Sequence, residues 1–242
     1  MIQFYCPDIE KEAVLPEGES GHCVRVLRNK EGQEIYVVDG KGARYLCSIE
    51  DAHPKHTVLK ILQKEIIKER DYFLTLAVAP TKNADRMEWM VEKAMEIGVD
   101  RIVLLQCDRS ERKVLRSDRL LKVMISAMKQ SLSARLPELT DLISFKNFIL
   151  QSSGNAQKFF GYCSEEFPKK EFVKECKAGG EVIVMIGPEG DFTPQEVDLA
   201  ISNGFMPVTF GEKRLRTETA GVFAVCAVDI INQLSQVEIE GA

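Results

Sequence analysis

Hydrophobic and polar residues follow two different patterns along the chain, and the change between them falls near residue 70. Before that point, the chain has short β-branched and apolar runs at residues 34–39, 45–49 and 57–62, and turn signals separate these runs. Asp39-Gly40-Lys41-Gly42 is typical of a hairpin turn, because glycine adopts positive φ at little cost. A short helix is expected over 20–28, and the charged stretch 64–70 has the composition of a linker. The pattern predicts a small β-rich unit.

After Asp71, strand-like runs alternate with helical ones. Buried strands are expected at 72–79, 101–105, 158–163, 181–186 and 207–210, and helices at 85–97, 117–132 and 220–234. In the first helix apolar residues recur at i, i+3, i+4 and i+7, and Gly98 ends it. Segments 151–157 and 168–177 are polar and are expected to be surface connections. Alternating strands and helices predict an α/β domain with a parallel sheet.

A glycine-rich loop follows the predicted strand that ends at Ile186. It contains Gly187-Pro188-Glu189-Gly190, and a helix start signal comes directly after it. Thr193 is placed as N-cap, Pro194 at the first helical position, and Glu196 completes a capping box. Open α/β sheets bind ligands at such strand–loop–helix junctions. A plain turn between strand and helix would have the same composition, so this pattern alone leaves both readings open.

A second loop, residues 210–221, connects another predicted strand to the apolar C-terminal helix. Thr217 or Thr219 is suited to cap that helix, and Glu218 suits its positive N-terminal end. The loop is either a charged connection or a working site. The chain has neither GxxxxGK[ST] nor GxGxxG after a strand, which argues against a Walker A site and a dinucleotide fold.

Composition narrows the class of protein further. The seven cysteines are scattered and odd in number, and only three histidines are present, so reduced thiols are expected and a metal site is not. The N-terminus lacks the basic and apolar regions of a signal peptide, and the longest apolar stretch is too short to cross a bilayer. We therefore expect a cytoplasmic protein without membrane contact.

The net charge of −5 argues mildly against a nucleic-acid partner, but one stretch is strongly basic. Residues 109–135 carry a net charge of +6, from Glu111, Asp118 and eight basic residues: Arg109, Arg112, Lys113, Arg116, Arg119, Lys122, Lys129 and Arg135. Such a stretch is compatible with RNA binding and equally with a solvated helix face.

Taken together, the two loops resemble the SPOUT class of methyltransferases, and within it the ribosomal RNA small subunit methyltransferase E family. The matching segments, in family order, are His22 with Val26-Leu27-Arg28, then Lys82, Glu88, Lys93, Glu96 and Gly98, then Gln130-Ser131 with Arg135 and Pro137, then GPEG at 187–190 and LRTETA at 215–220. The sequence departs from the family pattern at Asp191, Lys213, Arg214 and Ser133.

The resemblance implies two domains: a PUA-like RNA-binding β-barrel at 1–70 and an α/β domain with a C-terminal trefoil knot at 71–242. It implies a homodimer that uses S-adenosylmethionine to methylate N3 of one uridine near the 3′ end of 16S rRNA, in the small ribosomal subunit. Knots are rare, so the hydrophobic pattern alone does not predict one. Three alternatives stay open: a SPOUT enzyme with another RNA target, a non-catalytic RNA-binding relative, and a nicotinamide enzyme.

The resemblance also assigns site residues. Arg216 is the candidate that stabilises developing negative charge, and Glu218 is either a proton acceptor or a helix-cap residue. Cofactor binding is expected at Ile186, Gly187, Pro188, Glu189, Gly190, Gly211, Leu215, Thr217, Thr219 and Ala220. RNA contacts are expected at Arg25, Arg28, Lys82, Arg109, Arg112, Lys113 and Arg135.

Overall fold

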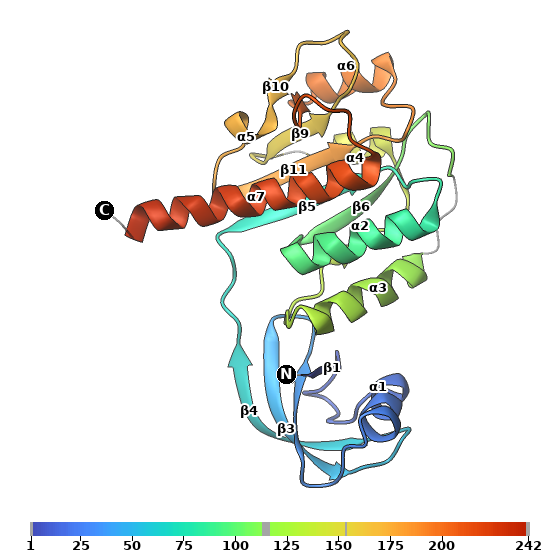
Figure 1. Ribbon diagram of the computed structural model, residues 1–242, viewed down its shortest axis with the longest axis vertical. Coiled ribbons are helices and arrows are strands. Elements are labelled where there is room, and N and C mark those ends of the chain that lie inside the picture. The colour runs from blue at the N-terminus through green and yellow to red at the C-terminus, as the bar shows by residue number, and fades with distance from the viewer. Residues whose placement is uncertain (1, 113–116, 153, 241–242) are drawn as a thin grey trace. The chain divides into compact units, whose positions relative to one another are not determined.

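The structure is a computed structural model that describes residues 2–112, 117–152 and 154–240 (Figure 1). Its contacts divide the chain into two compact units. The first consists of Met1–Glu69 and Met124–Leu136, and the second of Arg70–Val123 and Pro137–Ala242. The sequence places the boundary between residues 70 and 71; the contacts also assign 124–136 to the first unit.

The first unit is built on a four-stranded sheet with the order β1-β2-β3-β4. Its elements are β1 Gln3–Tyr5, α1 Glu17–Gly21, the π-helical turn η1 His22–Val26, β2 Glu34–Val38, β3 Ala43–Asp51 and β4 Val58–Ile66. β1 pairs with β2 in parallel, and the other pairs are antiparallel. Alternate residues of β3, among them Tyr45, Cys47 and Ile49, are fully buried, as period-two packing on one face requires. The expected β-rich unit is therefore present.

The end of β4 differs from the sequence prediction. Residues 64–66 were expected in a linker, but Lys64 pairs with Tyr45 and Ile66 with Ala43 in the ladder. β4 is the last strand in the order, and its residues from Lys60 onward are exposed. An edge strand with solvent on it tolerates charged residues, so its composition resembles that of a linker.

Segment 124–136 is fixed to the first unit by long-range hydrogen bonds. Gln3 Nε2 donates to the carbonyl oxygens of Met128 (3.1 Å) and Ser133 (2.7 Å). Lys129 Nζ pairs with Glu19 at 2.6 Å. Gly42 has φ 109°, and a Cβ there would lie 2.7 Å from the Arg135 guanidinium carbon, so this close approach requires glycine.

The second unit contains a parallel sheet with the order β10-β12-β9-β11-β5-β6-β7, and β8 pairs separately with β6. The strands are β5 Tyr72–Val78, β6 Arg101–Gln106, β7 Glu138–Leu139, β8 Ile143–Ser144, β9 Gln157–Gly161, β10 Lys170–Glu171, β11 Gly180–Ile186 and β12 Met206–Thr209. The helices are α2 Ala84–Ile97, α4 Phe145–Gln151, α5 Phe172–Glu175, α6 Pro194–Ser202 and α7 Thr217–Glu240. The helix α3 Ser117–Gln130 begins in this unit, and its residues from Met124 onward are assigned to the first unit. Every strand pair of this sheet is parallel, which confirms the α/β prediction.

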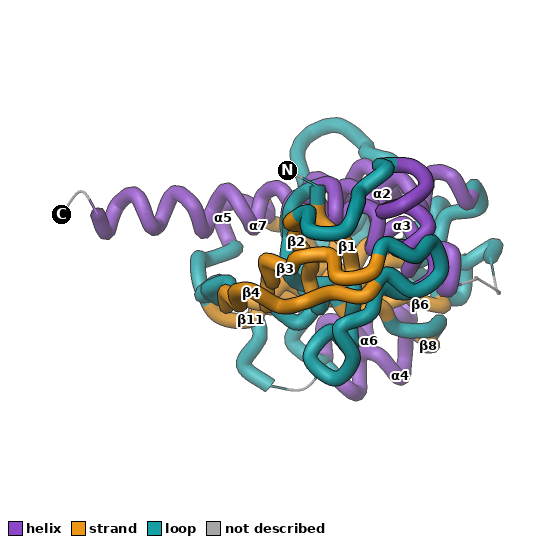
Figure 2. The backbone as a smooth tube through the Cα atoms, turned by 90° about the horizontal axis from the view of Figure 1, so that it is seen from below, coloured by secondary structure: helices purple, strands orange, loops and turns teal. Residues whose placement is uncertain are grey.

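Helices cover both faces of this sheet. α2 and α7 pack together on one face, where a Cβ on Gly221 of α7 would lie 3.6 Å from the side chain of Leu76 in β5. The other face carries α4 and α6, whose Phe148 and Val197 join Ala77 and Met185 in one hydrophobic cluster. Figure 2 shows α4 and α6 on the opposite side of the strands from α2. Among the described residues no helix is long and apolar enough to span a membrane.

Segment 168–177 is not the plain surface connection that its lysines suggest. It contains β10 and α5, and Phe172 is fully buried. The Phe172 ring packs edge-on against Phe159 (5.2 Å) and Phe210 (5.3 Å). One buried aromatic residue between Glu171 and the exposed Val173 gives no periodic pattern, so the sequence did not reveal it.

A cavity of ≈ 340 Å³ lies against the sheet between β5, β6, β11 and α4. Thr75 lines it, and the Thr75 hydroxyl is buried with no hydrogen-bond partner among the described residues. Thr75→Val keeps the side-chain shape and removes an unsatisfied polar group. We expect it to raise the free energy of unfolding by about 1 kcal/mol. Urea unfolding followed by the fluorescence of Trp89, the sole tryptophan, measures this in the second unit.

Thr140→Val is the matched control, because the Thr140 hydroxyl accepts a hydrogen bond from Leu104 N at 3.4 Å. This variant leaves a backbone donor unpaired and is expected to lower stability by about 1 kcal/mol. Equal losses in both variants would contradict the assignment of Thr75 as unsatisfied.

Candidate active site at the carboxyl ends of the strands

Four loops of the second unit emerge at the same edge of the sheet. β12, β9, β11 and β5 are neighbours and parallel, so the segments that follow their last residues lie at one edge. Both loops that the sequence singled out, 187–192 after β11 and 210–216 after β12, are among them. This is the edge at which open parallel sheets bind ligands.

The GPEG loop follows Ile186, which is buried and whose carbonyl oxygen accepts a hydrogen bond from Ala79 N at 3.0 Å. Glu189 Oε1 accepts a hydrogen bond from Lys82 N at 3.0 Å. This bond connects the GPEG loop to the segment after β5. The predicted capping box is confirmed: Thr193 accepts from Glu196 N, and Glu196 accepts from Thr193 N. The local start signal of α6 therefore sets where the loop ends.

The second loop is joined to the first by one buried hydrogen bond. Thr217 is the first residue of α7, and its hydroxyl donates to the Gly187 carbonyl oxygen at 3.1 Å. The sequence predicted that Thr217 or Thr219 caps the helix, whereas this hydroxyl connects two loops. Gly211 has φ 127° and open space beside its Cα, so its backbone is accessible.

The Phe210 ring packs against the end of β9 at this edge of the sheet. A Cβ on Gly161, the last residue of β9, would lie 2.6 Å from Cε2 of the Phe210 ring and 3.5 Å from Ile186 Cδ1. A side chain at Gly161 would therefore displace the ring. The glycine allows Phe210 to pack across the end of β9, beside the start of the GPEG loop.

The two candidate catalytic residues lie in different environments. Arg216 is exposed, and Glu218 is buried in the first turn of α7. Glu218 Oε1 lies 3.6 Å from Nε of Arg86, which belongs to α2. The sequence did not reveal Arg86, because the two residues are far apart along the chain and no local pattern connects them. The pair supports the structural role of Glu218 over that of a free proton acceptor.

The residues predicted to contact RNA are not one continuous free surface. Arg25 and Arg28, in the first unit, are exposed and have no acidic partner among the described residues. Lys82 pairs with Glu111 (2.9 Å) and Arg135 with Glu69 (2.6 Å). Arg112 is half-buried, and Lys113 lies outside the described residues.

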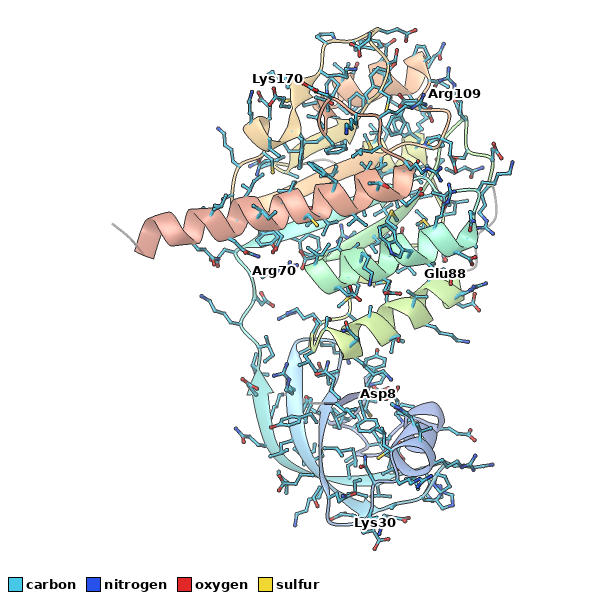
Figure 3. All side chains as sticks on the ribbon, in the orientation of Figure 1. Asp8, Lys30, Arg70, Glu88, Arg109 and Lys170 are labelled. Carbon is cyan, nitrogen blue, oxygen red and sulfur yellow. The ribbon has the colours of Figure 1, made fainter. Side chains whose placement is uncertain are left out.

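Acidic neighbours neutralise other parts of the basic stretch. Arg119 lies 2.6 Å from Glu88, which Figure 3 labels on α2, and Lys129 pairs with Glu19. Arg109, also labelled there, donates from Nη1 to the carbonyl oxygens of Gly190 (2.8 Å) and Phe192 (3.4 Å). Its guanidinium is thus engaged with the GPEG loop.

The cysteines take no part in a metal or disulfide centre within the described residues. All seven are free thiols, and no group of three possible metal ligands was found among the residues that the structure describes. Cys163, after β9, is exposed, and partial burial together with Asp191 raises the pKa of its thiol. It is therefore a poor nucleophile at neutral pH.

Comparisons with known proteins place the chain in a family. Residues 68–229 match the model of an RNA methyltransferase domain, and residues 15–62 match that of an RNA methyltransferase PUA domain. Ribosomal RNA small subunit methyltransferase E of Bacillus subtilis is 25% identical over 229 residues, 89% of each chain. The Aquifex aeolicus protein of the same name is 28% identical and covers 88% of this chain and 91% of its own.

Solved structures agree over nearly the whole chain. A probable rRNA-methyltransferase from Porphyromonas gingivalis is 38% identical with a TM-score of 0.93, over 97% of this chain and 100% of that one. Ribosomal RNA small subunit methyltransferase E from Neisseria gonorrhoeae, bound to S-adenosyl methionine, is 25% identical with a TM-score of 0.84, over 96% and 98%. The chain, with its PUA-like first unit and α/β second unit, therefore belongs to the RNA methyltransferase family of ribosomal RNA small subunit methyltransferase E.

Proposed function

We propose that this protein transfers the methyl group of S-adenosylmethionine to N3 of a uridine near the 3′ end of 16S rRNA in the small ribosomal subunit. The observation that carries the proposal is the Thr217–Gly187 hydrogen bond, which holds the GPEG and LRTETA loops together at the ligand-binding edge of the sheet. The relatives' names and the cofactor in the Neisseria structure supply the reaction class.

The residues at this edge fit the proposed cofactor. Ile186 and Ala220 are buried apolar neighbours of the loops, and Leu215 is half-buried. Gly211 leaves open space where a side chain would otherwise stand, so a ligand can approach its backbone. We assign cofactor binding to the residues that the sequence predicted: Ile186, Gly187, Pro188, Glu189, Gly190, Gly211, Leu215, Thr217, Thr219 and Ala220.

Bound S-adenosylmethionine supplies an electrophilic methyl group. N3 of uracil carries a proton and becomes nucleophilic as that proton departs, which places negative charge on the ring oxygens until N3 takes the methyl group and the sulfonium leaves as a neutral thioether. Arg216 is exposed beside the anchored Thr217, and its guanidinium is our candidate to stabilise this charge. Glu218, paired with Arg86, orders the first turn of α7 that presents Arg216.

RNA contact is assigned first to Arg25 and Arg28, because they are exposed and unpaired within the described residues. A homodimer is supported by the apolar side chains that α7 leaves exposed: Phe223 (37%), Ile230 (53%) and Leu234 (60%). We also propose the trefoil knot that the resemblance implies, and a cytoplasmic location beside the ribosomal substrate.

The test is transfer of labelled methyl from S-adenosylmethionine to small ribosomal subunits that lack the modification, followed by nucleoside analysis. Appearance of 3-methyluridine is the expected result. Binding of the cofactor without transfer would indicate a SPOUT enzyme with another RNA target. Failure to bind the cofactor would favour the non-catalytic RNA-binding alternative.

Leu215→Asp is expected to weaken S-adenosylmethionine binding by at least about 30-fold, because a charge replaces an apolar contact in the proposed site. Isothermal titration calorimetry measures the Kd. Leu150→Asp, at an exposed leucine of α4, is the control and should bind normally. Gly187→Trp is unsuitable, since a Cβ at Gly187 already lies 3.1 Å from the Phe192 ring. If both Leu variants bind S-adenosylmethionine with equal affinity, the assignment of the cofactor site to this edge is wrong.

A further inference from the structure

The GPEG loop is held by side chains from outside its own strand and helix. Residues 187–193 lie between β11 and α6, and the glycines at both ends of the GPEG segment, 187–190, make its backbone intrinsically adaptable. A loop that must present fixed backbone groups to a ligand gains affinity when it is held in the bound conformation beforehand. Besides the bonds at Gly187 and Glu189 described above, two further side chains hold this loop: Arg109 from the loop after β6, and Asp191, which directly follows Gly190.

Arg109 provides the first contact, from the loop after β6. Its Nη1 donates to the Gly190 and Phe192 carbonyl oxygens, at 2.8 Å and 3.4 Å. A Cβ on Gly190 would lie 3.3 Å from Arg109 Cβ, so the side chain packs flat against this glycine. The loop that carries Arg109 is itself fixed, because Asp108 N donates to Glu196 Oε1 at 2.9 Å.

Asp191 provides the second contact, toward the loop after β9. It is one of the positions at which the sequence departs from the family pattern, and its φ of 61° lies in the left-handed region, which aspartate tolerates better than most residues. Its Oδ2 accepts from Cys163 N at 2.9 Å, and its Oδ1 accepts from Phe192 N at 2.9 Å. The carboxylate therefore links the GPEG loop to the loop after β9.

We propose that Arg109 and Asp191 are positioning residues that clamp the GPEG loop in its cofactor-binding conformation, and that Arg109 is not an RNA contact. The inference rests on the proposed function, in which that loop binds S-adenosylmethionine. Arg109 is reassigned because its guanidinium already donates to carbonyl oxygens of the loop. A phosphate could bind this guanidinium only by competing with those oxygens.

The experiment measures two affinities for each variant: the Kd for S-adenosylmethionine, and the Kd for small ribosomal subunits at several salt concentrations. Arg109→Ala is expected to raise the cofactor Kd about tenfold and to leave the salt dependence of RNA binding unchanged. Arg109→Lys keeps a donor and should recover part of the cofactor affinity. Arg28→Ala is the control; it should keep the cofactor Kd and reduce the salt slope by roughly 0.7 to 0.9.

Two substitutions of Asp191 separate clamping from backbone strain. Asp191→Asn tolerates positive φ and keeps one oxygen that can still accept from Cys163 N, so its cofactor Kd should stay within about twofold of wild type. Asp191→Gly removes strain together with the link and should raise the Kd about fivefold. If strain relief were the governing effect, Asp191→Gly would bind more tightly than wild type. At saturating cofactor, kcat should recover in each variant, which a collapsed site would not allow.

The outcomes distinguish the two levels of inference. A wild-type protein that does not bind S-adenosylmethionine overturns the proposed function and the clamp with it. Normal wild-type binding with unchanged cofactor Kd in Arg109→Ala and Asp191→Gly overturns the clamp alone. A reduced salt slope in Arg109→Ala, restored in Arg109→Lys, returns Arg109 to the RNA-binding surface.

Discussion

Replacing Arg216 by alanine is expected to lower kcat by about 100- to 1,000-fold while leaving the Kd for S-adenosylmethionine unchanged. A preorganised cation that acts on charge developing in the transition state contributes to the chemical step and not to cofactor affinity. Arg216 is exposed, and the next residue, Thr217, is anchored to Gly187, so the backbone that presents the guanidinium is fixed. Single-turnover methyl transfer to small subunits at saturating cofactor isolates this step.

Two other variants define what the loss means. Lys213→Ala removes a neighbouring exposed cation of the same loop and should retain kcat within a factor of about two. Glu218→Gln should lose less than about tenfold, because Glu218 is buried against Arg86 and is assigned a structural role. A loss in Glu218→Gln as large as that in Arg216→Ala would restore Glu218 as proton acceptor. An equal loss of kcat in Lys213→Ala would indicate that Arg216 acts only through general electrostatic attraction of RNA.

The parts of the fold that the sequence predicted are those set by local signals. The parallel α/β arrangement follows from strands alternating with helices, and the α6 start follows from Thr193, Pro194 and Glu196 within four positions. Gly98 ends α2 where a C-cap glycine was expected. Each of these depends on neighbours in the chain, so pattern reasoning reaches them.

The parts that the sequence missed depend on partners distant in the chain. β4 extends through charged residues because an edge strand has solvent on it, and Phe172 is buried by Phe159 and Phe210. The helix α4 and the strands β1, β7 and β8 are short, and short elements carry little periodic signal.

The same distinction applies to the candidate site. Motif resemblance found the two loops, but the bonds that hold them in place, Thr217 to Gly187 and Arg109 to Gly190, join segments that follow different strands. Charge counting along 109–135 suggested a free basic face. In space, Glu88 and Glu19 pair with Arg119 and Lys129, and both acids lie outside that stretch. A linear sum of charge therefore overstates how much of it is available to RNA.

Glu196 makes both local hydrogen bonds and a hydrogen bond to a residue distant in the chain. Glu196→Ala is expected to lower the free energy of unfolding of the second unit by about 3 kcal/mol. The side chain is 6% exposed. Oε2 accepts from Thr193 N at 2.9 Å and from its hydroxyl at 3.1 Å, and Oε1 accepts from Asp108 N at 2.9 Å. Alanine breaks the capping box and leaves two backbone donors without their acceptor, and each such loss costs about 1–3 kcal/mol.

Urea unfolding followed by Trp89 fluorescence measures the change in the unit that contains the substitution. Glu171→Ala is the matched control, because Glu171 is exposed and its ion pair with Lys174, at 2.9 Å, lies on the surface. Its loss should stay within about 0.5 kcal/mol. Glu196→Gln retains one acceptor oxygen and should fall between the two. If Glu196→Ala is as stable as Glu171→Ala, the loop after β6 is held by other contacts, and the Asp108–Glu196 bond is a consequence of the fold and not one of its supports.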